Sequence, residues 1–236
     1  MTKIVLRWGR HFIVQSSQEK HRLLSLLPSA RIAVIPHPVY DMFADQRIPK
    51  EEARKYLKLP LDAPILLFFG MVREYKGLKT IIAAMPEIRA RLEKVILLVV
   101  GEFWEDKRRY LEMIKRLGIE DSVIVEDRYI PNEEVGLYFS AADALIASYQ
   151  QLTGSGAIQM ARGFGIPVIF TNRCGKPRPL ENQIFVEDIC SLASQVIRFF
   201  TEGYKQDTTV KHDSFEFTSW EQLVDVIERL FDGGQI

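Results

Sequence analysis

Short, uniformly hydrophobic runs alternate with segments of helical spacing from residue 64 to about residue 200. The runs 65–69 and 95–100 are apolar at every position, which is typical of parallel strands covered on both faces. Shorter runs predict further strands at 122–125, 144–147, 168–170 and 184–186. Strands that alternate with helices form a parallel sheet with right-handed crossovers and helices on both faces, so we predict an α/β fold.

Helix ends are indicated by capping residues, glycines and prolines. Helices are predicted at 50–57, 78–92, 105–117, 132–139, 155–163 and 189–200, with Gly118 as the stop of the third. Pro86 should kink the second helix or restart it, because proline lacks an amide hydrogen and clashes with the preceding turn. The segment Thr218-Ser-Trp-Glu221 fits a capping box and should begin the last helix.

The first 44 residues contain two strands, at 12–14 and 32–35, around one helix at 18–27. This is too little to close a core, and Pro36-His37-Pro38 reads as an extended linker. We therefore divide the chain into an N-terminal segment, 1–44, and a larger domain, 45–236. Exposed strand edges seek partners, so the segment should pair with a second copy, pack unusually on its own domain, or be mobile.

Arg73 and Lys76 form the sharpest local signal, because they lie in the loop 70–77 between a buried strand and a helix start. A helix dipole disfavours cations there, and a bound phosphate would reverse that effect. These residues therefore predict phosphate binding. The alternative is that both are ordinary solvated side chains.

A second anion site is predicted where Gly154, Ser155 and Gly156 begin a helix after the strand at 144–147. Ser155 is a favoured N-cap, and the first amides of a helix have no internal partner. Phosphate is the usual ligand of such a site, although an ordinary capped helix would look the same. Gln159 could face the ligand or solvent.

Weaker candidates follow two other strands. Glu102, after Gly101, could bond a sugar hydroxyl or be solvated, and the loop 127–130 could present backbone groups to a base edge beside Tyr129. We find no paired nucleophile and base, no metal-spaced cluster and no Walker loop.

Composition excludes several classes of function. The formal net charge is zero with a pI near 6.9, which gives no support for nucleic acid binding through bulk charge. The two cysteines fit a reducing cytoplasm, and no apolar run is long enough to span a bilayer.

Together the motifs resemble the group 1 (family 4) glycosyltransferases of the GT-B fold. Phe68-Phe-Gly-Met-Val-Arg-Glu-Tyr-Lys-Gly77 looks like their FGxxRxYKG phosphate loop, and Val99-Val-Gly-Glu102 is similar to their VGEG turn. Further likenesses are Leu117 to Val123 (LGLxDRV), Ala141-Ala-Asp143, Ser155 to Ile169 (SGxxQxAxxFGxPVI) and the closing Phe217 to Trp220.

The resemblance implies the Rossmann-like C-terminal half of a GT-B fold, preceded by a β-α-β remnant of the N-terminal, acceptor-binding half. It implies retaining sugar transfer from a nucleotide-sugar donor, as in polysaccharide synthesis, without a metal or other cofactor. Arg73 and Lys76 would stabilise the leaving diphosphate. Donor contacts are implied for Gly70, Met71, Gly101, Glu102, Arg128, Tyr129, Thr153, Gly154, Ser155, Gly156 and Gln159.

Several departures from the family pattern qualify these assignments. Leu152 and Met160 occupy the positions of the family's Glu-x7-Glu pair, so Gln159 is the nearest substitute, and the loop 173–183 is shorter than usual. Most of an acceptor half is not found in the sequence, so we expect a fragment or a chain completed by a partner polypeptide, with self-association through the N-terminal segment as a further option.

Two alternatives remain open at this point. The chain could be a non-catalytic nucleotide-sugar-binding or assembly module, an idea that the lost glutamates favour. A GT-B-type epimerase or phosphorylase ranks lower, because the two phosphate loops suit the transferases better. We expect a cytoplasmic location, with peripheral membrane contact left open because such acceptors are often lipid-linked.

Overall fold

The computed structural model describes residues 11–149, 155–172, 183–186, 192–203 and 219–231. The chain forms two compact units that are not continuous in sequence. The smaller contains residues 1–39, 153–159 and 211–236, and the larger contains residues 40–152 and 160–210. The domain boundary predicted after residue 44 stays a prediction. It separates the two halves of a GT-B fold, whereas these units are groups of residues that contact one another.

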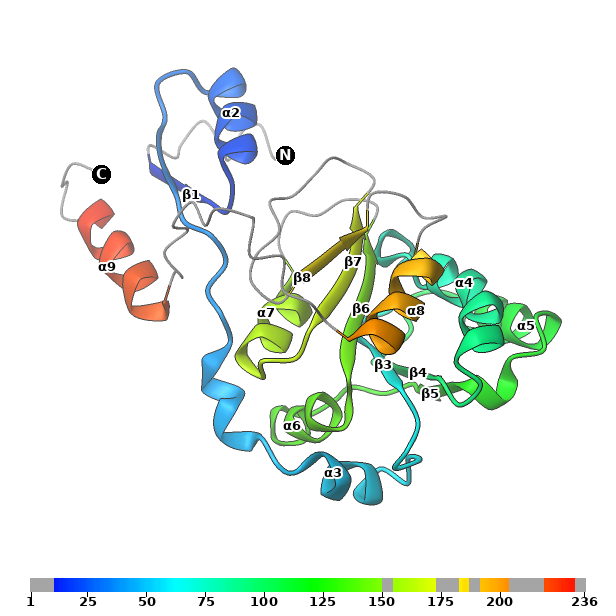
Figure 1. Ribbon diagram of the computed structural model, residues 1–236. Coiled ribbons are helices and arrows are strands. Elements are labelled where there is room, and N and C mark those ends of the chain that lie inside the picture. Colours follow the sequence, from blue (N-terminus) through cyan, green and yellow to red (C-terminus); the bar gives the residue numbers. More distant parts are fainter. Residues whose placement is uncertain (1–10, 150–154, 173–182, 187–191, 204–218, 232–236) are drawn as a thin grey trace. The chain divides into compact units, whose positions relative to one another are not determined.

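The larger unit is built on a parallel sheet whose strand order, over the described residues, is β5-β4-β3-β6-β7-β8 (Figure 1). Every neighbouring pair is parallel, with Ile65 opposite Ile96 at the start of the β3–β4 pair. The predicted parallel sheet is therefore confirmed. The strands are β3 (Ile65–Phe69), β4 (Ile96–Val100), β5 (Val123–Glu126), β6 (Ala144–Tyr149), β7 (Val168–Asn172) and β8 (Gln183–Val186).

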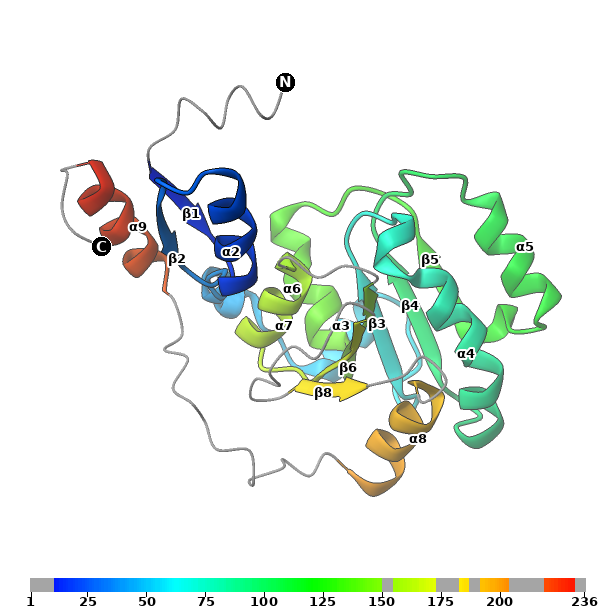
Figure 2. The same cartoon turned by 90° about the horizontal axis from the view of Figure 1, so that it is seen from above.

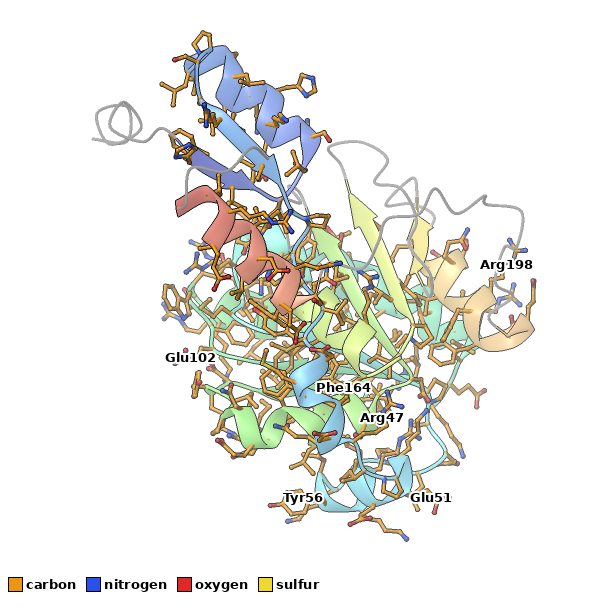
Figure 3. All side chains as sticks on the ribbon, turned by 90° about the vertical axis from the view of Figure 1, so that its left-hand side faces the viewer. Arg47, Glu51, Tyr56, Glu102, Phe164 and Arg198 are labelled. Carbon is orange, nitrogen blue, oxygen red and sulfur yellow. The ribbon has the colours of Figure 1, made fainter. Side chains whose placement is uncertain are left out.

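Helices cover both faces of this sheet, as the apolar strands predicted (Figure 2). One face packs against α4 (Leu78–Arg91), α5 (Arg108–Arg116) and α8 (Leu192–Glu202) in a continuous core. The other carries η1 (Asp41–Gln46), α3 (Lys50–Tyr56) and α6 (Asn132–Ala141). Phe139 of α6 stacks on Phe164, which follows α7 (Gly156–Gly163), with 5.2 Å between the ring centroids. Arg47 donates to the carbonyl of that phenylalanine (Figure 3).

Two predicted helix starts are wrong. The helix α4 continues through Pro86 to Arg91, so the predicted restart is wrong, whereas the alternative of a kink stays a prediction. Proline removes one helical hydrogen bond, and the fully buried side chains Ile81, Met85 and Ile88 on either side of it hold the helix against the core. The helix α5 begins at Arg108 and not at residue 105. The chain before it is engaged with the loop after β3, and Asp106 accepts the Arg108 amide.

Arg54 of α3 is buried and makes three hydrogen bonds where β3 and β6 begin. Its guanidinium donates to the carbonyls of Ala141 and Leu61 and to the Asp143 carboxylate, the last at 2.8 Å. The same carboxylate accepts the Ile65 amide at 2.7 Å and pairs with Lys50. Asp143, noted in sequence as part of the Ala-Ala-Asp motif, is therefore a structural anchor of the sheet.

The smaller unit contains the predicted β-α-β segment: β1 (His11–Val14), α2 (Ser17–Leu26) and β2 (Arg31–Val34), with the two strands parallel. It also contains α9 (Trp220–Phe231), whose Trp220 indole donates to the Val39 carbonyl at 3.0 Å. The described capping box of α9 is Ser219 with Gln222, one residue later than predicted, and Thr218 lies outside the described residues. How the N-terminal segment associates stays a prediction.

Candidate functional site

The loops after β3, β4 and β5 begin side by side at the carboxyl edge of the sheet. The β3–β4 pairing continues beyond the strands through backbone hydrogen bonds. The Val72 amide donates to the Glu102 carbonyl at 2.8 Å, and the Trp104 amide donates to the Val72 carbonyl at 3.1 Å. The Gly101 amide donates to the backbone carbonyl of Glu126 at 3.0 Å, which connects the second loop to the third. In parallel α/β sheets this edge is where ligands bind.

Glycine is required where the first two loops meet. Gly101 has φ +131°, and a Cβ on it would lie 2.5 Å from the Gly70 carbonyl oxygen. Gly70 itself has φ +99°, a backbone conformation that residues other than glycine rarely adopt. The predicted donor residues Gly70 and Gly101 are therefore brought into contact, and the backbone between them is bare.

Lys76 folds back over this backbone. It lies in η2 (Glu74–Lys76), and its Nζ is 2.9 Å from the point where a Cβ on Gly70 would be. Burial and then the neighbouring Arg73 charge lower the pKa of Lys76 to about 8. The salt bridges found across the described residues give Lys76 no acidic partner, so its charge is available to an anionic ligand.

Arg73 lies on an aromatic ring that sequence reasoning missed. Its guanidinium carbon is 4.3 Å from the centroid of the Trp104 ring, and the Trp104 residue is 60% exposed. The sequence does contain a signal for this residue. A tryptophan in the loop just after a fully buried strand is a large apolar side chain at an exposed place, which indicates a candidate functional role. Among the described side chains, no carboxylate forms a salt bridge with Arg73.

The other predicted contacts on these loops are accessible. Glu102 is exposed (Figure 3), and Met71 and Tyr129 are 41% and 66% exposed. Asp127 accepts the Phe103 amide and pairs with Lys107, each at 3.0 Å, and so links the second and third loops.

Arg128 has partners of its own. Its guanidinium pairs with Glu126 at 2.6 Å and with Glu134, and donates to the Tyr138 hydroxyl at 2.9 Å. The bonds to Glu134 and Glu126 raise the pKa of Arg128. Two carboxylates thus offset its charge, and the network fixes the start of the loop 127–130. The donor contact predicted for Arg128 stays a prediction.

The start of α7 has the predicted N-cap. The Ser155 hydroxyl accepts the Ile158 amide at 3.3 Å, and its carbonyl accepts the Gln159 amide at 3.1 Å. Gly156 and Gln159 are half-buried. Thr153 and Gly154 lie outside the described residues. The cap is confirmed, and its use as an anion site stays a prediction.

The described ranges contain neither a metal-ligand cluster nor a membrane-spanning helix. No group of three or more His, Cys, Asp or Glu side chains there could hold a metal ion. No helix in this part of the chain is both long enough and apolar enough to cross a bilayer.

A family model described as glycosyl transferases group 1 matches residues 63–202, well over half of the chain. The chain therefore belongs to this family, and the resemblance carried by its loop motifs is confirmed. The match includes all three loops at the carboxyl edge of the sheet.

Relatives of known name agree with this assignment. D-inositol 3-phosphate glycosyltransferase 2 of Catenulispora acidiphila is 26% identical over 238 residues, 94% of this chain and 50% of the relative. The GDP-mannose-dependent alpha-(1-6)-phosphatidylinositol monomannoside mannosyltransferase of Mycolicibacterium smegmatis is 31% identical over 156 residues, 64% of this chain and 38% of the relative. The chain thus spans half or less of these relatives.

Solved structures share the fold. Sucrose-phosphate synthase from Thermosynechococcus elongatus superposes with a TM-score of 0.76 at 25% identity, covering 99% of this chain and 61% of that one. The Anabaena HepE protein in complex with UDP and glucose gives 0.66 at 15% identity, covering 86% and 59%. The predicted fold, a Rossmann-like α/β sheet of the GT-B type, is confirmed.

Proposed function

We propose that this chain is the donor-binding part of a retaining glycosyltransferase, which moves a sugar from a nucleotide sugar to an acceptor in glycan or polysaccharide synthesis. Family membership supports sugar transfer as the reaction class. The acceptor site would be supplied by residues outside the larger unit or by a partner polypeptide. We expect no metal requirement.

One observation carries the proposal: two cations at the carboxyl edge of the sheet have no acidic partner among the described residues. Lys76 is partly desolvated and lies over the bare backbone of Gly70, and Arg73 lies beside it on an uncharged ring. Two adjacent cations without carboxylates repel each other, which costs free energy unless a polyanion binds both. A diphosphate fits this need in charge and in hydrogen-bonding capacity.

The chemistry follows from that placement. The bond between the anomeric carbon and the diphosphate oxygen breaks, and the oxygen keeps the electron pair. An acceptor oxygen forms the new bond to the same carbon and releases its proton. Negative charge therefore grows on the diphosphate, where Arg73 and Lys76 stabilise the transition state more than the ground state.

The relatives suggest which nucleotides to test, since one is named as GDP-mannose-dependent and one solved structure contains UDP. Calorimetry of the 236-residue chain with UDP and GDP should detect binding at millimolar concentration or below. Arg73→Ala and Lys76→Ala should each weaken that binding about tenfold, as expected for a charge-assisted contact.

The matched control is Lys115→Ala, which removes an exposed cation from α5 and should leave the affinity unchanged. No heat and no thermal shift with either diphosphate would overturn the donor-site assignment. Equal losses from all three substitutions would mean that general charge, and not this site, attracts the nucleotide.

A non-catalytic nucleotide-sugar-binding module is the second candidate. It is favoured by Met160 of α7, which stands where the family resemblance places a glutamate. This candidate predicts the same diphosphate binding but no transfer when an acceptor-binding half is supplied. A transfer assay with donor consumption measured alongside therefore separates the two.

A further inference from the structure

Arg73 contacts an uncharged ring, although two glutamates lie on the same loops. Glu74 is its neighbour in the chain, and Glu102 is exposed on the adjoining loop, yet the guanidinium lies 4.3 Å from the centroid of the Trp104 ring. The salt bridges of the described residues include none between Arg73 and either glutamate. The contact that the guanidinium makes is therefore with the ring of Trp104.

Backbone register brings the two side chains together. Val72 forms an isolated parallel bridge with Phe103, and the Trp104 amide donates to the Val72 carbonyl at 3.1 Å. The residues that follow each partner of the bridge, Arg73 and Trp104, thus leave the sheet edge side by side. Gly101 must be glycine for this approach, because a Cβ there would meet the Gly70 carbonyl. The backbone therefore fixes the point from which the indole leaves the sheet edge, next to Arg73.

An aromatic ring holds a guanidinium in a way that a carboxylate cannot. The face of the indole attracts the cation through its quadrupole and leaves the net positive charge in place. The N–H donors of a guanidinium lie in its own plane, so a ring above that plane leaves them open to a bidentate oxyanion. A glutamate would instead occupy those donors and neutralise the charge.

We propose that Trp104 is a positioning residue for Arg73, holding the guanidinium in place and fully charged for the diphosphate of the donor. This inference rests on the proposed function, since it assumes that Arg73 binds that diphosphate. Trp104 need not touch the ligand, and its exposed indole acts through Arg73.

A double-mutant cycle tests this directly on the 236-residue chain. Trp104→Leu should weaken UDP or GDP binding about two- to fivefold, the range expected for a cation–π contact at an exposed site. Trp104→Phe should retain part of the affinity, because phenylalanine keeps a ring of lower attraction for cations. In an Arg73→Gln background, Trp104→Leu should have no further effect, because the group that it positions is gone.

A second readout needs no ligand. The side-chain NMR signals of Arg73 should carry an upfield ring-current shift that Trp104→Leu abolishes. Tyr56→Leu is the matched control, since Tyr56 is also an exposed aromatic residue, 73% exposed on α3, and its loss should change neither quantity.

The outcomes separate the two proposals. If wild type binds a diphosphate but Trp104→Leu costs the same in both backgrounds, the indole supports only the loop, and the positioning role is overturned. Absence of the ring-current shift in wild type would overturn it as well. If wild type binds neither diphosphate, the proposed donor site itself falls, and the positioning role falls with it.

Discussion

A Cβ on Gly77 would lie 1.8 Å from the carbonyl oxygen of Ser148. Gly77 ends the loop that carries Arg73 and Lys76, and it has φ +68°. Ser148 lies in β6, and its buried hydroxyl is 2.8 Å from that of Thr171 on β7. The loop that carries the two cations therefore lies directly against β6, at a distance that only glycine allows.

Gly77→Ala should consequently be far more costly than Gly118→Ala. Both glycines have a left-handed backbone conformation, with φ +68° and +62°, but a Cβ on Gly118 would meet nothing within 4 Å. Backbone strain alone should cost Gly118→Ala about 1–2 kcal/mol of unfolding free energy. The backbone clash should bring Gly77→Ala to about 4 kcal/mol or more. Urea denaturation of both variants measures this, and equal losses would show that the close approach is not present in solution.

Nucleotide binding should depend on pH through Lys76. Its pKa is lowered to about 8, and a diphosphate favours the protonated form and raises that pKa in the complex. Affinity should therefore be highest below pH 8 and should decrease, by up to about tenfold per pH unit, as the pH rises above 8. Calorimetry with UDP between about pH 7 and pH 9.5 measures the slope. Lys76→Met should remove it, and a slope that persists in this variant would assign it to another group.

Asp143→Ala should destabilise the chain strongly without touching the donor loops. It would leave the Arg54 guanidinium, whose side chain is 5% exposed, without its carboxylate. Breaking a buried pair from one side costs about 3–5 kcal/mol, which a thermal melt would register as a large decrease in melting temperature. Asp62→Ala is the control, because it breaks a pair with Lys94 whose two side chains are both 66% exposed. That variant should melt close to wild type, and similar losses from both would refute the anchoring role.

Arg73→Ala and Lys76→Ala should lower turnover more than they weaken donor binding, because charge on the leaving diphosphate grows in the transition state. The expected loss is about 3 kcal/mol of transition-state stabilisation, or about two decades in rate. Steady-state transfer with a supplied acceptor-binding half tests this, with melting curves to show that the variants are folded. Transfer at the wild-type rate would mean that neither cation takes part in the reaction.

The sequence alone predicted the sheet and the place of the candidate site. Strands such as β3 and β4 are apolar at every position, so burial on both faces, and with it a parallel sheet, follows from local composition. The cap at Ser155 and the stop at Gly118 are also local, because their partners lie within one turn. The loop of Arg73 and Lys76 was predicted because its charges lie between a strand and a helix.

Tertiary structure decided the features that depend on partners distant in sequence. Continuity of α4 through Pro86 depends on core contacts that outweigh one missing hydrogen bond. Arg128 could be read from its loop as a free ligand contact, but α6 supplies Glu134 and Tyr138 to bind it. The indole under Arg73 comes from the next strand's loop, through a bridge between Val72 and Phe103 that no local pattern encodes. Apolar periodicity thus determines which helices and strands form. The strand order then decides which loops become neighbours, and so which side chains each charged residue contacts.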